Sequence, residues 1–211
     1  MTRNGWGVGT LVLRVAVLAA ACGQGESGSE NGERSANASE SANEGDSAED
    51  GTFQGVVDSY EVAQREIEEE GGEQRVGEYR VGYIIEPAEG WWEGDPKNLT
   101  WREPAPSETN HIEILPFEAG SGLLVPEADI TLTVLDRSGN EVDSKPLSFY
   151  RGEFYHYANN FSLPESGTYA LRAEIAPPNF LRHETEEAEG RVFTEPVVAE
   201  FENVHIDTEE G

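Results

Sequence analysis

A histidine and a glutamate stand two residues apart near the middle of the chain, at His111 and Glu113. Ile112 and Ile114 alternate with them, which predicts a strand whose isoleucines face a core. Residues two apart in a strand point to the same face, about 6.6 Å apart along the chain. An imidazole nitrogen and a carboxylate oxygen on one face can bind iron, zinc, Cu(II) or manganese. The pair is therefore a candidate metal site, although such a pair on an outer strand face is more often simply solvated.

Three other histidines complete the set. His156 lies in the aromatic segment 154–157, where a half-buried structural histidine bonded to the backbone fits equally well. His183 precedes several glutamates, a pattern that also fits a surface ion pair. His205 lies on the expected last strand, near the acidic end of the chain, and is expected at the surface.

Alternating apolar and polar residues predict the strands that would position these groups. The pattern recurs at 79–85, 112–114, 130–134, 147–150, 154–161, 169–175 and 197–206. Turn residues separate these segments, and no helix–strand alternation argues for an α/β enzyme fold. The sequence therefore predicts an all-β, Ig-like antiparallel β-sandwich over residues 76–211. A short helix and its connection are expected at 53–75, with Gly71 and Gly72 ending the helix.

The N-terminus resembles an export signal. Residues 1–22 combine Arg3 and Arg14 with an apolar run too short to span a bilayer. The segment from Leu18 to Cys22 resembles a bacterial lipobox, although Leu18 sits one place early. We expect lipidation at Cys22, with an ordinary signal cleaved nearby as the alternative. Cys22 is the only cysteine, so an intrachain disulfide is excluded.

Composition defines a tether and excludes one class of partner. Residues 23–52 are rich in Gly, Ser, Glu, Asn and Ala and contain no aromatic residue, which predicts a disordered acidic linker. The whole chain has 42 acidic and 14 basic residues and a net charge of −28. Nucleic acid is therefore excluded as a partner, because phosphate binding needs clustered Lys and Arg.

Several segments resemble one known family and occur in the same order. They are His111–Glu113, Glu127–Ile130, His156–Asn160, Gly167–Tyr169, Ile175–Pro178 and Phe180–His183, followed by Gly190 and Pro196. From about Tyr79 to Ile206 the chain resembles the periplasmic iron-transport proteins. This resemblance implies a small dimeric Ig-like sandwich that binds copper and takes part in ferrous or ferric uptake.

The resemblance also implies a ligand set. Carried over, the metal ligands would be His111, Glu113, His156 and His183. The family adds a methionine around Phe149, but the only methionine here is Met1. Without that soft thioether the remaining donors suit Cu(II), iron or zinc better than Cu(I). The residues expected to surround or cap the site are Glu86, Tyr155, Tyr157 and Phe149, with Trp91 and Trp92 as further candidates for a cap or a dimer interface.

These observations predict an exported lipoprotein that binds iron or copper, with zinc as a further candidate. It would hold the ion for a membrane permease in iron transport, on the outer face of the cytoplasmic membrane or in the periplasm. The resemblance implies a homodimer. The alternative is an Ig-like interaction or adhesion domain whose histidines are structural. An enzyme is not expected, because no nucleophile elbow, phosphate loop or His-Glu-x-x-His motif occurs.

The acidity leads to a first prediction. From Phe53 onward, 34 of the 42 acidic residues face 11 basic ones, so the folded domain repels itself at low ionic strength. If the surface is adapted to salt, the melting temperature rises as KCl or NaCl is added. A flat or falling melting temperature would instead indicate an ordinary acidic extracytoplasmic surface.

Overall fold

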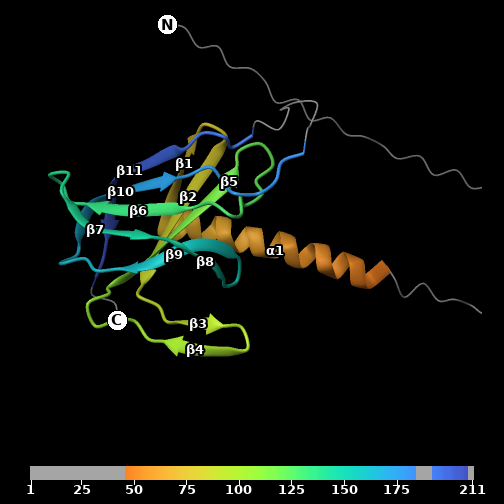
Figure 1. Ribbon diagram of the computed structural model, residues 1–211, viewed down its shortest axis with the longest axis horizontal. Coiled ribbons are helices and arrows are strands. Elements are labelled where there is room, and N and C mark those ends of the chain that lie inside the picture. The colour runs from red at the N-terminus through yellow and green to blue at the C-terminus, as the bar shows by residue number, and fades with distance from the viewer. Residues whose placement is uncertain (1–45, 184–191, 209–211) are drawn as a thin grey trace, which may run out of the picture. The chain divides into compact units, whose positions relative to one another are not determined.

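The computed structural model describes residues 46–183 and 192–208 (Figure 1). The export signal, Cys22 and the linker up to residue 45 lie outside the described residues. No helix of the described part is both long enough and apolar enough to cross a membrane.

Two antiparallel sheets pack into a β-sandwich, as the alternating pattern predicts (Figure 1). The first sheet has the order β1 (Gly71–Val76), β2 (Tyr79–Pro87), β5 (Asn110–Glu118), β9 (Tyr155–Phe161) and β8 (Ser148–Arg151). The second has the order β11 (Val197–Ile206), β10 (Gly167–Ile175), β6 (Ile130–Leu135) and β7 (Glu141–Pro146). A separate hairpin of β3 (Trp91–Asp95) and β4 (Asn98–Arg102) lies beyond one end of the first sheet (Figure 1).

The core lies between the two sheets. Ile112 and Ile114 of β5 are fully buried there against residues such as Leu132 and Leu171 of the second sheet. Because successive side chains of a strand alternate between its faces, the histidine and glutamate of β5 lie on the outer face of the first sheet.

That outer face is covered by the helix α1 (Asp46–Glu70). Ala63 and Ile67 of the helix form a second apolar cluster with residues of the sheet and of the loop before β9. The sheet and loop residues of this cluster are Ile84, Leu115, Phe117 and Phe154. Side chains between this cluster and the β3–β4 hairpin are therefore shielded from water, although they do not face the main core.

The helix begins earlier than the sequence predicts. It starts at Asp46, within the segment expected to be disordered, and not near Phe53. Once the packed part of a helix has formed, each further turn adds hydrogen bonds at low entropic cost. The helix does end at Glu70, just before the two glycines.

Four strands were not predicted. Strands β1 and β7 are edge strands with mostly polar sequences, and β3 and β4 form the hairpin outside the two sheets. Edge strands and isolated hairpins bury few alternate side chains, so the period-two signal is weak there.

Gly71 joins the helix directly to β1 and leads to a second prediction. A Cβ atom at Gly71 would lie 1.7 Å from the backbone oxygen of Tyr83 on the neighbouring strand. Gly71→Ala should therefore force the backbone apart and lower the melting temperature by several degrees, since overpacking costs about 1–3 kcal/mol. Gly120→Ala is the matched control, because a Cβ there meets nothing within 4 Å. Equal melting temperatures of the two variants, measured by circular dichroism, would contradict this close approach.

Candidate metal centre

Strand register gathers the candidate donors on the outer face of the first sheet. On the neighbouring strands β5 and β9, His111 pairs with Asn160 and Glu113 pairs with Ala158. His156 lies two residues before Ala158, so it is diagonal to Glu113 on the same face. Two adjacent strands thus supply two imidazoles and one carboxylate to one place.

These three side chains form a compact buried cluster. One donor atom from each of His111, Glu113 and His156 lies within 4.8 Å of the others. Their residues are only 2%, 4% and 7% exposed, respectively. The solvated-pair interpretation of the sequence is therefore wrong for His111 and Glu113, because the helix and the hairpin cover them.

Burial sets the protonation of the cluster. It raises the pKa of Glu113 to about 9, helped by nearby Glu86, Glu66 and Glu89. Burial, with the neighbouring His111 ring, lowers the pKa of His156 to about 4, and burial also lowers the pKa of His111. All three groups are therefore neutral at pH 7, and the 3.4 Å contact between Glu113 Oε1 and His156 Nε2 is not an ion pair.

The donor atoms of the cluster are incompletely paired. Among the described residues, Glu113 Oε2 and His156 Nδ1 are buried and have no hydrogen-bond partner. An unpaired buried polar atom is costly unless something satisfies it. Two imidazoles and a carboxylate are donors that transition-metal ions prefer, and a cation would supply the partner that Glu113 Oε2 lacks, so the residues present fit such an ion.

Asn160 holds the other side of the His111 ring. Its fully buried side chain places Oδ1 2.9 Å from His111 Nδ1. The atom of His111 left free for a ligand is therefore Nε2, since Nδ1 is engaged. A metal-binding histidine is commonly fixed in this way through its second ring nitrogen.

Aromatic rings close the site on the hairpin side. The Tyr150 ring on β8 stacks on His156, with centroids 5.6 Å apart and planes 8° apart, and meets the His111 ring edge-on at 5.7 Å. Trp91 packs edge-on against Tyr150 at 5.5 Å and lies 6.4 Å from the His111 ring. A cleft of about 620 Å³ between the hairpin and β8 reaches both histidines, so it is the route by which an ion could enter.

The residues expected to surround the site have different positions. Glu86 pairs with His111 across β2 and β5, and burial, with neighbouring Glu89, raises its pKa to about 7. Phe149 lines the cleft, but its ring stacks on the exposed Tyr155 ring at 5.4 Å. Tyr157 lies in the main core on the other face of β9, where its hydroxyl donates to the Val125 carbonyl.

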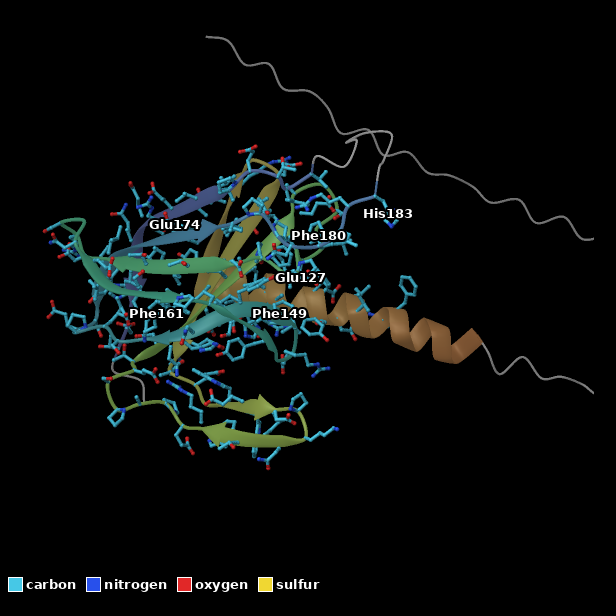
Figure 2. The ribbon with its side chains drawn as sticks, viewed as in Figure 1. Glu127, Phe149, Phe161, Glu174, Phe180 and His183 are labelled. Atoms are coloured by element: carbon cyan, nitrogen blue, oxygen red, sulfur yellow. The ribbon has the colours of Figure 1, made fainter. Side chains whose placement is uncertain are left out.

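His183 does not join the cluster within its own chain. It is exposed and lies on the segment that follows β10, at the edge of the described residues. Figure 2 shows it beyond Phe180 and well separated from Phe149 and Phe161 of strands β8 and β9. The structure thus brings together three of the four donors that the resemblance implies.

Sequence reasoning missed several groups around the site. Asn160 was quoted only for the resemblance, and Tyr150 was not considered at all. Arg102, the last residue of β4, and Glu108, in the loop after it, were also missed. The sequence did hold a clue to Tyr150. It lies six positions before His156, on the preceding predicted strand, and residues at that spacing can pair across a short antiparallel turn.

A family comparison agrees with this fold. Residues 108–206 match the family model described as Fe²⁺ transport protein. The resemblance inferred from the sequence is thereby confirmed for the Fe²⁺ transport protein family. The matched range contains all three clustered donors and Asn160. A search of curated protein sequences finds no match to the chain.

Two solved structures of P19 share this fold at low sequence identity. A copper-bound variant of P19 from Campylobacter jejuni is 17% identical, with a TM-score of 0.52, and the match covers 67% of this chain and 97% of that one. Copper-reconstituted P19 from the same organism is 18% identical, with a TM-score of 0.50, over 64% and 94% of the two chains. FetP from uropathogenic Escherichia coli is 19% identical, with a TM-score of 0.49, over 65% and 96%.

The raised pKa of Glu113 predicts how stability depends on pH. In the unfolded chain this carboxyl group ionises near its ordinary value of 4.5, whereas the folded protein keeps it protonated up to about pH 9. The contribution of Glu113 to the free energy of unfolding is therefore complete below the unfolded pKa and is lost progressively as the pH rises from one value to the other. His156, with a pKa of about 4, has finished titrating by pH 7, whereas Glu86, with a pKa of about 7, is then half ionised and adds to the fall just above pH 7 in both the wild type and a Glu113 variant. The melting temperature of the metal-free protein should fall by several degrees between pH 7 and 9.

Glu113→Gln provides the matched control, because an amide of the same shape cannot ionise. Its melting temperature should change distinctly less over the same pH range, as followed by differential scanning calorimetry in the presence of a chelator. Parallel profiles for the two proteins would contradict the burial of a neutral Glu113.

Proposed function

We propose that this protein is an exported metal-binding protein of an iron-transport system. It holds a transition-metal ion, iron or copper, between His111, Glu113 and His156. The observation that carries this proposal is the convergence of three buried donors within 4.8 Å. The match to the Fe²⁺ transport protein family over residues 108–206 supports iron as the bound ion. The copper-bound P19 structures support copper as the alternative.

The donor chemistry favours a borderline or hard ion. Two imidazole nitrogens and a carboxylate oxygen suit Cu(II), Fe²⁺ or Zn²⁺, and no thioether is available because the only methionine is Met1. Glu113 must lose its proton to bind as a carboxylate, so ion uptake releases a proton below about pH 9. The protein binds and releases the ion, and we propose no catalysis.

We propose that His183 is a fourth ligand supplied by a second copy of the chain. Its exposure and its separation from the cluster of its own chain leave the side chain available to a partner. A dimer in which each copy contributes this histidine to the other would complete both sites by the same symmetric contact. This proposal extends the homodimer that the family resemblance implies.

The resemblance of residues 1–22 to an export signal supports a location outside the cytoplasm for the ion carrier. A lipid at Cys22 and the acidic segment behind it would keep the sandwich near the outer face of the cytoplasmic membrane, close to an iron permease. The net charge of −28 concentrates cations around the molecule, an effect that salt weakens.

The competing function is an Ig-like interaction domain with structural histidines. The exposed Trp92 and Trp101 rings, edge-on at 5.4 Å on the hairpin, favour a surface for a protein partner. The unpaired buried atoms of Glu113 and His156 count against purely structural histidines. A protein that takes up no metal but binds a cell-surface partner would favour this alternative.

Substitution of the clustered histidines tests the metal site. His111→Ala and His156→Ala should each lower the affinity for Cu²⁺ at least tenfold, because each removes one of three donors. Affinity is measured by competition with a chelator of known strength, after elemental analysis of protein purified without chelator. His205→Ala is the control, since the His205 side chain is exposed on β11 and contacts Asp207. Wild-type affinity in both cluster variants would show that the ion binds elsewhere.

A further inference from the structure

The side chain of Asn160 is the most completely bonded polar group near the site. Its Oδ1 accepts a hydrogen bond from the Glu89 backbone N–H at 3.2 Å and lies 2.9 Å from His111 Nδ1. Its Nδ2 donates to the Glu89 carbonyl at 2.7 Å and to Glu108 Oε2 at 3.3 Å. All four bonding positions of this fully buried amide are therefore used.

These partners fix which way the amide points. A backbone N–H can only donate, and a carbonyl or an ionised carboxylate can only accept. A flipped amide would set its NH₂ group against the Glu89 N–H and its oxygen against two acceptors. Oδ1 must therefore face His111, and His111 Nδ1 must carry the hydrogen that completes the contact. The lone pair of a neutral His111 ring then lies on Nε2.

Glu108 strengthens the hydrogen bond between Asn160 and His111 from the other side of the amide. Burial alone would raise its pKa, but hydrogen bonds from Arg102, the Ala105 backbone and Asn160 lower it, so the group is a carboxylate. Arg102 Nη2 donates to Glu108 Oε1 at 2.7 Å, and the Ala105 N–H donates to Oε2 at 2.7 Å. A carboxylate on the NH₂ side of an amide polarises it, which makes the amide oxygen a stronger acceptor for His111.

The same carboxylate also anchors the cover of the site. The Arg102 guanidinium that binds Glu108 lies 4.1 Å from the centroid of the Trp91 ring. Trp91 in turn packs beside the His111 ring and against Tyr150. The network therefore runs from the imidazole, through the amide and the carboxylate, to the hairpin ring above the imidazole.

We propose that Asn160 is a positioning residue that locks His111 as its Nδ1–H tautomer and so presents Nε2 as a ready ligand, and that the Glu108 carboxylate strengthens this hydrogen bond through the amide. The pair extends the carboxylate–histidine arrangement of metal sites by one amide. It also ties the orientation of His111 to the hairpin through Arg102. This inference rests on the proposed metal-binding function only for its consequence, ion affinity, because the tautomer exists without the ion.

The tautomer is measured in the metal-free protein by ¹⁵N NMR of its histidine rings, with His111 assigned by the loss of its signals in His111→Ala. The expected result is a protonated Nδ1 and an unprotonated Nε2. A protonated Nε2, or a mixture of the two forms, in the wild type would overturn the proposal. Because no ion is present, this result does not depend on whether the protein binds metal.

Two variants and a control test the consequence. Asn160→Ala should release the tautomer towards a mixture and lower Cu²⁺ affinity about tenfold, the usual effect of losing a partner behind a ligand. Glu108→Gln should keep the tautomer but lower affinity severalfold. Asn159→Ala is the matched control, because Asn159 lies on the other face of β9, where its side chain donates to the Pro146 carbonyl and contacts Asn160 only by accepting from its backbone N–H, not through the amide that faces His111. It should keep the wild-type tautomer and affinity.

The outcomes separate the two proposals. If the Asn160→Ala and Asn159→Ala proteins show the same His111 tautomer and the same Cu²⁺ affinity, Asn160 is not a positioning residue. If Glu108→Gln binds Cu²⁺ as tightly as the wild type, the role of Glu108 is overturned. If the wild type takes up no ion while its His111 is a pure Nδ1–H tautomer, the proposed function fails and the positioning of His111 stands.

Discussion

The arrangement of this protein depends on burying three titratable side chains on the outer face of a sheet. The outer face of a sheet normally meets water. On such a face His111, Glu113 and His156 could stay hydrated, and their charged forms would carry no desolvation cost. Here they lie beneath a helix and a hairpin, so each must remain neutral or find a counter-charge. Burial without a counter-charge is the reason that the pKa of Glu113 is raised and that of His156 is lowered. A bound cation would relieve this constraint by pairing with the partnerless Glu113 oxygen.

Two elements outside the sandwich create this environment. The helix packs Ala63 and Ile67 on one half of the outer face and seals the far side of the cluster. The hairpin places Trp91 over the other half and leaves a cleft that reaches the histidines. The sandwich therefore supplies the register that aligns the donors, whereas the helix and the hairpin exclude water from them. The polar network through Asn160 connects the two roles, because it contacts His111 at one end and the hairpin at the other.

Much of the fold could be predicted from the sequence, for a physical reason. Strands such as β5, β6 and β10 bury every second side chain between the sheets, so their alternation is strong. The hairpin could not be predicted from alternation, because its side chains pack on one another and on the site. The Gly-containing strand β1 likewise shows no alternation of apolar and polar residues. Alternation also tells which face a residue occupies but not what covers that face. This is why His111 and Glu113 were placed correctly but their burial was not foreseen.

The candidate site was predictable only in part. His111 and Glu113 are two apart in sequence, so local geometry alone puts them together. His156 joins them through the pairing of β5 with β9, which only the family resemblance indicated before the register was known. His183 was assigned by the same resemblance, yet the fold of one chain leaves it exposed and apart. If His183 serves a second copy of the chain, as we propose, the local pattern of its own chain carries no sign of that role.

The central claim is that one ion sits among His111, Glu113 and His156. Crystals of the protein loaded with Cu²⁺, recorded at the copper absorption edge, test it directly through anomalous scattering. The account predicts one strong anomalous peak per chain, within bonding distance of His111 Nε2, a Glu113 oxygen and a His156 nitrogen. A peak elsewhere on the surface, with these three side chains unliganded, would contradict it.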